Sequence, residues 1–173
     1  MKSFIDRTIE ESSQNIGKCL HCQKCSNGCP ISFAMDSYPN QIIRLLQLGQ
    51  EERVYKSKTI WLCLACETCA TRCPMEIDLT RVMATLREMA ISKGYESPLP
   101  KIKLYHDMFL KSIKYTGRMF ESGLFGLYGI LAKQPFRDLN IGQKLFFKGK
   151  LSLFPSIVWR KKEIKKVFEK IKV

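Results

Sequence analysis

The sequence predicts an all-α protein built from two helical parts. Apolar residues recur at helical spacing in several segments, most clearly after Tyr38 and after Asp78. Runs that alternate β-branched and polar residues, which are typical of strands, are missing from the 173-residue sequence. Ser97-Pro98-Leu99-Pro100 interrupts the helical periodicity with two prolines. We therefore expect one domain over 1–97 and a helical extension over 98–173.

The first part begins with two helices whose ends carry local signals. Residues 3–13 predict a short amphipathic helix with Ser3 in the N-cap position. A second helix is expected to begin at Pro39, because proline is tolerated in the first helical turn. Its end is expected at Gly49, which would act as the C-cap. The apolar stripe between these ends consists of Ile42, Ile43, Leu45, Leu46 and Leu48.

Three further signals complete the first part. Glu51-Glu52-Arg53 is interpreted as a polar turn, and residues 57–62 predict one more helical turn. Asp78 is a suitable N-cap for a helix over 79 to about 93. Gly94 is expected to end that helix.

The second part is both basic and rich in apolar residues. Residues 98–173 contain 17 Lys and Arg against 5 Asp and Glu, whereas residues 1–97 contain 12 against 11. An amphipathic helix is expected over 101–114 and a basic helix over 156–172. The aromatic and apolar residues between them indicate either an intersubunit surface or a second small helical core, and we favour the surface.

All eight cysteines lie in two runs with the same spacing, C-x2-C-x2-C-x3-C-P. The first run contains Cys19, Cys22, Cys25 and Cys29, and the second contains Cys63, Cys66, Cys69 and Cys73. Bacterial-type ferredoxins hold [4Fe–4S] clusters with this spacing, and the fourth cysteine of each run ligates the cluster of the other run. Three closely spaced thiolates can surround one corner of a cubane, and the proline then redirects the chain. The sequence therefore predicts two [4Fe–4S] clusters within 1–97.

Two other roles of cysteine explain these runs less well. A disulfide framework needs an oxidising compartment, and the beginning of the sequence lacks the apolar segment of a signal peptide. Zinc sites prefer C-x2-C pairs that are separated by a longer loop. We therefore keep zinc as the alternative to iron–sulfur clusters.

Two other residues of the first run are assigned structural roles. His21 lies between cysteines, but four cysteines suffice for a cluster, so we expect it to be a neighbour of the cluster rather than a ligand. Gly28 precedes Cys29 and is expected to let the backbone approach a cluster closely. No residue is predicted to be catalytic, because nucleotide fingerprints, nucleophile motifs and spare cysteines are all missing.

The net charge of +13 indicates a partner of opposite charge. Nucleic acid, anionic lipid and an acidic protein would each fit. The lysines are scattered and no nucleic-acid module is recognisable, so we favour a protein partner. No window reaches the roughly 18 apolar residues of a membrane span, and we expect the chain in the cytoplasm, where thiols stay reduced.

Both cysteine runs, their helical connector and several shorter segments carry a family resemblance. These segments are Ile77-Asp78-Leu79, Leu86-Arg87-Glu88-Met89-Ala90, Tyr105-His106-Asp107 and Tyr115-Thr116-Gly117-Arg118. With them the chain resembles, over nearly its whole length, the iron–sulfur subunit (C) of the heterodisulfide reductases of methanogenic archaea. The iron–sulfur subunits of succinate dehydrogenase and fumarate reductase resemble residues 1–97 too. They add a plant-type [2Fe–2S] domain upstream, for which this chain has no cysteines.

The resemblance implies an electron relay without a substrate site of its own. In that family, the flavin subunit (A) splits electron pairs between two routes, and the iron–sulfur subunit (C) takes the electrons of one route to the catalytic subunit (B). The catalytic subunit (B) reduces the coenzyme M–coenzyme B heterodisulfide (CoM-S-S-CoB) in methanogenesis. The flavin and catalytic subunits are therefore the expected partners in a larger hetero-oligomer, together with an associated hydrogenase or formate dehydrogenase. The alternative is a relay subunit of a complex similar to succinate dehydrogenase or fumarate reductase.

The resemblance also implies which cysteines bind which cluster. The expected ligands are Cys19, Cys22, Cys25 and Cys73 for one cluster, and Cys63, Cys66, Cys69 and Cys29 for the other. Because each cluster would join both runs, we expect loss of the clusters to unfold the domain.

Metal analysis separates the iron–sulfur prediction from the zinc alternative. We expect the anaerobically purified chain to be brown and to contain about eight iron atoms, because each cubane takes four irons and four thiolates. Iron, acid-labile sulfide and zinc are measured on the same sample. Stoichiometric zinc in place of iron would contradict the cluster prediction.

Overall fold

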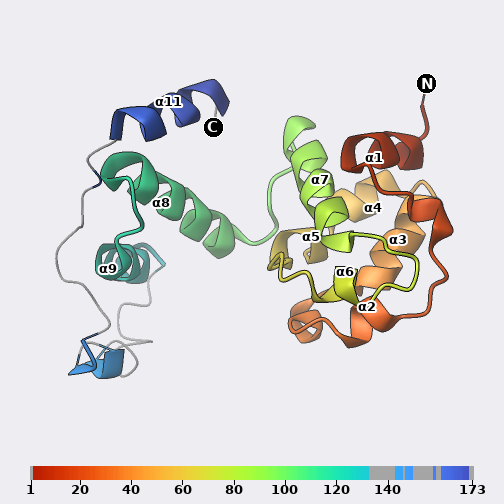
Figure 1. The fold of residues 1–173 in the computed structure, drawn as a ribbon, viewed down its shortest axis with the longest axis horizontal. Helices are drawn as coiled ribbons and strands as arrows, with labels where there is room; N and C mark the ends of the chain where they lie inside the picture. The colour runs from red at the N-terminus through yellow and green to blue at the C-terminus, as the bar shows by residue number, and fades with distance from the viewer. Residues whose placement is uncertain (1, 133–142, 146, 150–157, 159–160, 172–173) are drawn as a thin grey trace. The chain divides into compact units, whose positions relative to one another are not determined.

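Helices form all the regular secondary structure of the described part of the chain. A computed structural model describes residues 2–132, 143–145, 147–149, 158 and 161–171 (Figure 1). The all-α prediction is therefore confirmed for these residues. The chain divides into two compact units, Met1–Leu99 and Pro100–Val173. None of the described helices is both long enough and apolar enough to cross a membrane.

The first unit is built from short helices joined by tight turns. Its α-helices are α1 (Phe4–Ser12), α2 (Lys24–Asn27), α3 (Pro39–Gln47), α4 (Glu51–Lys56), α5 (Thr59–Leu62), α6 (Thr68–Thr71) and α7 (Leu79–Ser92), with 3-10 turns at Ile16–Lys18 and Ser32–Ala34. Helix α7 packs against α1, α4, α5 and α6 (Figure 1). The longest helix of the unit thus holds the shorter ones together.

The predicted helix ends are largely correct. Ser3 forms a capping box with Asp6 at the beginning of α1, and the Asp78 side chain accepts a hydrogen bond of 3.0 Å from the Arg81 amide. Pro39 occupies the first position of α3. The C-cap of α3 is Leu48 rather than the predicted Gly49, which follows with a φ of 67° and so adopts the left-handed conformation common after helices.

The prediction of a polar turn at residues 51–53 was wrong. These residues form the first turn of α4, and Val54 and Tyr55 behind them are fully buried. Glu51 and Glu52 stand at the N-terminus of the helix, where negative charge is favourable. A helix of six residues is too short to show a period, so only its acidic beginning could have revealed it.

The core of the first unit lies between α1, α3, α4, α5 and α7. Its fully buried side chains include Ile42, Leu46, Val54, Tyr55, Ile60, Val82 and Leu86. The predicted stripe of α3 is correct in its centre, where Ile42 and Ile43 are buried. Leu48 is 56% exposed because the helix has ended before it.

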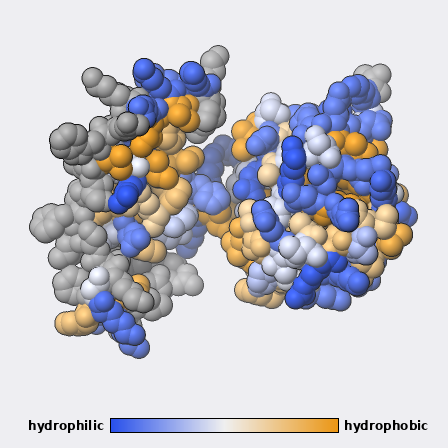
Figure 2. Space-filling model, viewed as in Figure 1, coloured by the Kyte–Doolittle hydropathy of each residue, from blue (hydrophilic) through white to orange (hydrophobic). Residues whose placement is uncertain are grey.

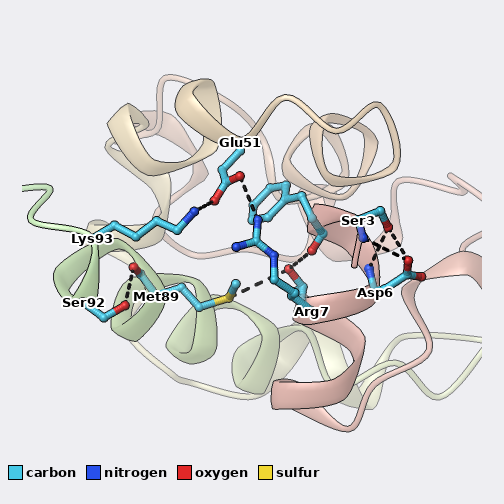
Figure 3. A network of polar contacts seen from close by, with 9 residues as sticks. Ser3, Asp6, Arg7, Glu51, Met89, Ser92 and Lys93 are labelled. Carbon is cyan, nitrogen blue, oxygen red and sulfur yellow. Dashed lines mark hydrogen bonds and ion pairs between the residues drawn. The ribbon is translucent and has the colours of Figure 1, made fainter. Parts of the chain in front are cut away.

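A charged network joins three helices at the edge of this core (Figure 3). The Arg7 guanidinium of α1 donates to the Glu51 carboxylate of α4 at 2.9 Å, and Lys93 at the end of α7 pairs with the same carboxylate. Burial acts to raise the pKa of Glu51, but the bonds from Lys93 and other neighbours lower it overall. The pairs are half-buried and form a network, so they contribute more than an isolated surface pair.

The second unit contains α8 (Pro100–Thr116), α9 (Glu121–Leu131) and α11 (Lys161–Ile171). Helix α8 confirms the helix predicted over 101–114, and it packs against both others. Tyr105 meets Tyr128 of α9 edge to face, with ring centroids 5.6 Å apart. Helix α11 confirms residues 161–171 of the basic helix predicted over 156–172. Val158 is described but is not helical, and the other residues of that prediction lie outside the described ones.

Asp36 fastens the segment before α3 to the beginning of α5. Its carboxylate accepts hydrogen bonds from the Ser57 hydroxyl at 2.6 Å, the Lys58 amide at 2.8 Å and the Thr59 hydroxyl at 2.9 Å. Burial acts to raise the pKa of Asp36, but these bonds lower it overall. Because α5 leads directly into the second cysteine run, Asp36 fixes where that run begins.

Removing the charge of Asp36 should weaken the first unit. We expect Asp36→Asn to lower the free energy of unfolding at pH 7 by about 1 kcal/mol, since hydrogen bonds to an ionised acceptor are lost. A lowered pKa means that this stabilisation is fully present above the ordinary pKa of Asp, about 3.9, and is lost only as the pH falls below it. Denaturant unfolding at pH 7 measures the change. The control is Glu10→Gln, which removes an exposed pair with Lys2 and should change stability much less. An equal effect of both variants would contradict the role of Asp36.

Candidate iron–sulfur centres

The two cysteine runs have the same backbone conformation, position for position. Each contains one short helix, α2 or α6, which carries the third cysteine of its run. Left-handed residues occur at the second and fourth positions after the first cysteine of each run. They are His21 (φ 52°), Gln23 (62°), Ala65 (52°) and Glu67 (59°). None of them is glycine, and this conformation is uncommon and costly for other residues.

The left-handed residues turn backbone amides toward sulfur. The His21 amide donates to the Cys19 sulfur at 3.5 Å. In the second run, burial raises the pKa of the Cys63 thiol, and a hydrogen bond from the backbone of Ala65 acts against this rise. An amide bond to sulfur stabilises negative charge on it, which is what a thiolate ligand requires.

Two cavities are lined by the cysteines. The first-run cavity is lined by Cys19, Cys22, Cys25 and Cys73, and the second-run cavity is lined by Cys63, Cys66, Cys69 and Cys29. Each cavity thus takes three cysteines from one run and the fourth from the other. These are the two groups that the sequence predicts as ligand sets, and the ligand assignment itself stays a prediction.

Contact between α2 and α6 brings the two cavities together. Cys25 lines one cavity and Cys69 the other, and the charge of Cys69 acts on Cys25. The thiols therefore surround two neighbouring spaces. In the described part of the chain, no three Cys, His, Asp or Glu side chains converge on a point that would suit a single ion.

The eight thiols are free, and they differ in exposure. Cys22 and Cys66, the second cysteines of the two runs, are exposed, whereas the other six are half-buried. Burial raises the pKa of Cys25 and of Cys69, and hydrogen bonds from Thr68 lower the pKa of Cys66. A site whose ligands are all soft thiolates suits an iron–sulfur cluster. The four cysteines of each cavity therefore fit a [4Fe–4S] group.

Several neighbours of the cysteines could not be found from their spacing. Thr80 at the beginning of α7 lies 3.6 Å from the Cys69 sulfur. Arg87 of α7 donates to the Ile60 and Cys63 carbonyls at 3.1 and 3.3 Å. Both come from a helix outside the cysteine runs, so only the fold places Thr80 at the second-run cavity and Arg87 next to Cys63.

Two residues of the first run behave partly as expected. His21 lines the cavity without being needed as a ligand, and its Nε2 lies 2.8 Å from Gln47 Oε1. Gly28 has another use than the predicted approach of the backbone to a cluster. A Cβ atom there would come within 2.5 Å of Arg72 Nη1, so glycine makes room for a side chain of the other run.

Comparison with known families defines the class of this protein. Residues 15–77 match the family model of the 4Fe-4S dicluster domain, a segment that includes both cysteine runs. This match supports an iron–sulfur, electron-transfer role for the chain.

Two curated relatives make the assignment more specific. The chain is 27% identical over 178 residues to the CoB--CoM heterodisulfide reductase iron-sulfur subunit (C 2) of Methanocaldococcus jannaschii, covering 95% of this chain and 94% of the relative. It is 34% identical over 86 residues to the CoB--CoM heterodisulfide reductase iron-sulfur subunit (C) of Methanopyrus kandleri, covering 50% of this chain and 45% of the relative. The predicted resemblance to the iron–sulfur subunit (C) of heterodisulfide reductase is thereby confirmed.

Double variants test the exchange of the fourth cysteine. We expect Cys73→Ala to retain about four irons, because only the first-run cavity loses a ligand. Adding Cys22→Ala, in the same cavity, should remove little more iron. Adding Cys66→Ala, in the other cavity, should remove most of the rest. Iron and sulfide per chain are measured after anaerobic reconstitution, and the reverse pattern would show that Cys73 serves the cavity of its own run.

Proposed function

We propose that this chain is the electron-relay subunit of a heterodisulfide reductase complex. It would pass electrons one at a time from the flavin subunit (A) to the catalytic subunit (B), which reduces the CoM-S-S-CoB heterodisulfide. The observation that supports this most is the pair of neighbouring cavities, each lined by four cysteines. When bound there, [4Fe–4S] clusters supply one-electron redox centres.

We propose that each cavity holds one cluster through its four cysteines. The first would be bound by Cys19, Cys22, Cys25 and Cys73, and the second by Cys63, Cys66, Cys69 and Cys29. The matching backbone of the two runs supports equivalent ligation, because sulfur-directed amides occur at the same position in both. Contact between α2 and α6 supports a short path between the clusters.

The use of the cysteines favours a relay over catalysis. Every cysteine of the sequence lines one of the two cavities, so none is left to exchange thiols with a disulfide substrate. Cys22 and Cys66 are exposed, so one proposed ligand of each cluster lies at the surface of the unit. Electrons could enter at one such ligand and leave at the other without a substrate site in this chain.

We propose that residues 98–173 dock the chain onto its partner subunits, including an associated hydrogenase or formate dehydrogenase. This part holds 17 basic and 5 acidic residues. Helix α9 exposes Phe125, Leu127 and Ile130 by more than half, and Figure 2 shows apolar beside hydrophilic surface on this unit. Such surfaces are typical of interfaces. The complex would work in the cytoplasm, where thiols stay reduced.

Purification from the native host tests this function. The tagged chain should co-elute with flavin-containing and cysteine-rich subunits, and the complex should oxidise reduced carriers with CoM-S-S-CoB as acceptor. The matched control is Cys66→Ala, which leaves the first-run cavity its four cysteines, so the variant should still assemble but lose the electron transfer. Co-elution with dehydrogenase subunits similar to those of succinate dehydrogenase would favour the alternative, and a lone protein with salt-sensitive nucleic-acid affinity would contradict the relay.

A further inference from the structure

We propose that the second-run cavity gives its cluster the higher reduction potential, so that electrons move from the first-run cavity to the second. Thr80 and Thr68 are the positioning residues that create this difference, with Arg87 beside them. The inference rests on the proposed function, since it assumes that both cavities hold a [4Fe–4S] cluster.

Two hydroxyl groups face sulfur in the second-run cavity. Thr80 Oγ1 lies 3.6 Å from Cys69 Sγ, and Thr68 Oγ1 lies 3.5 Å from Cys66 Sγ. A cysteine bound to iron is a thiolate and has no proton to give. In the structure the Cys66 thiol donates to Thr68 Oγ1, and either atom can be the donor between Cys69 and Thr80. Once a cluster is bound, each contact can persist only with the threonine hydroxyl as the donor. Both threonines also line the cavity.

A fixed positive charge stands beside the same cavity. The Arg87 guanidinium is half-buried and is held by two bonds, to the carbonyls of Ile60 and Cys63. Arg87 Nη2 lies 3.3 Å from the Cys63 carbonyl oxygen, so the guanidinium charge is close to the first cysteine of the second run. A nearby positive charge favours negative charge on a thiolate.

The corresponding groups of the first-run cavity are engaged elsewhere. Ser26 Oγ lies 3.9 Å from Cys25 Sγ, but its hydroxyl donates to Asn40 Oδ1 at 2.6 Å. The His21 ring is bonded to Gln47. Lys24 takes the position that Thr68 has in the second run, and its ammonium group is exposed and strongly hydrated. The Ser26 hydroxyl thus donates to Asn40 at a much shorter distance than the one that separates it from the Cys25 sulfur.

These differences act in one direction on the reduction potential. Reduction adds one negative charge to a cluster, and hydrogen bonds to its sulfurs and nearby positive charge stabilise that state. The sulfur-directed amides at His21 and Ala65 occur in both runs and largely cancel in the comparison. The two hydroxyls and Arg87 remain, and all three favour reduction in the second-run cavity.

Potentiometric titration monitored by EPR tests the inference on the full-length chain after anaerobic reconstitution with iron and sulfide. The wild-type chain should show two couples. Thr80→Val removes the hydroxyl but keeps the shape of the side chain. It should lower the equilibrium constant for one-electron reduction of the higher couple by about tenfold, which is a fall of about 59 mV in its reduction potential. The lower couple should stay in place. The control is Thr85→Val on the same helix, a buried threonine that does not line the cavity, and it should shift neither couple.

Each other outcome has a definite meaning. A shift of the lower couple in Thr80→Val, no shift at all, or two couples of equal potential in the wild type would overturn the inference while leaving two clusters in place. A reconstituted chain with no iron would instead overturn the proposed function. An equal shift in Thr85→Val would show that the helix, and not the hydroxyl at Cys69, sets the potential, and would also overturn the inference.

Discussion

Each cavity is lined by three cysteines of one run and one cysteine of the other run, and the rest of the first unit depends on this exchange. Cys29 and Cys73 are the exchanged residues. Neither cavity is complete unless the two runs lie together, so the segments between them must fold first or fold with them. Helices α3, α4 and α5 provide this frame, because their buried faces join α7 in one core. With the proposed ligation, cluster binding and folding would be coupled in the way expected of metal sites whose ligands are far apart in sequence.

The exchange is supported by a strained backbone that the core holds in place. Four residues other than glycine adopt left-handed conformations in the two runs, each at a cost of about 1–3 kcal/mol. The strain has a use, since it turns amides toward the sulfurs. The cost is offset by contacts around the runs, such as the bond of 2.9 Å from the Asp78 amide to Gln14, which joins the beginning of α7 to the segment before the first run. The result is a functional site whose strained backbone is held in place by a well-packed core.

Local signals in the sequence predicted more of the fold than tertiary ones. The caps at Ser3 and Asp78 and the proline at position 39 act within one helical turn, so they could be recognised without the fold. Helix α4 was missed because six residues show no period. The cysteine spacing led to the two ligand groups, but Thr80 reaches Cys69 and Arg87 reaches the Cys63 carbonyl only through the packing of α7. Gly28 needed the position of Arg72 to be explained. Features that follow from residue spacing in the sequence could be predicted. Features that depend on contacts between distant segments could not.

Two neighbouring clusters joined by both runs can be detected directly by EPR of the fully reduced, full-length chain. Cys25 and Cys69 line different cavities and lie within electrostatic reach of each other. Two reduced [4Fe–4S] clusters at these positions should therefore interact magnetically. The predicted result is a broadened spectrum that cannot be reproduced by adding two isolated clusters. A spectrum equal to that sum, or the signal of a single cluster, would contradict the exchange of cysteines between two adjacent sites.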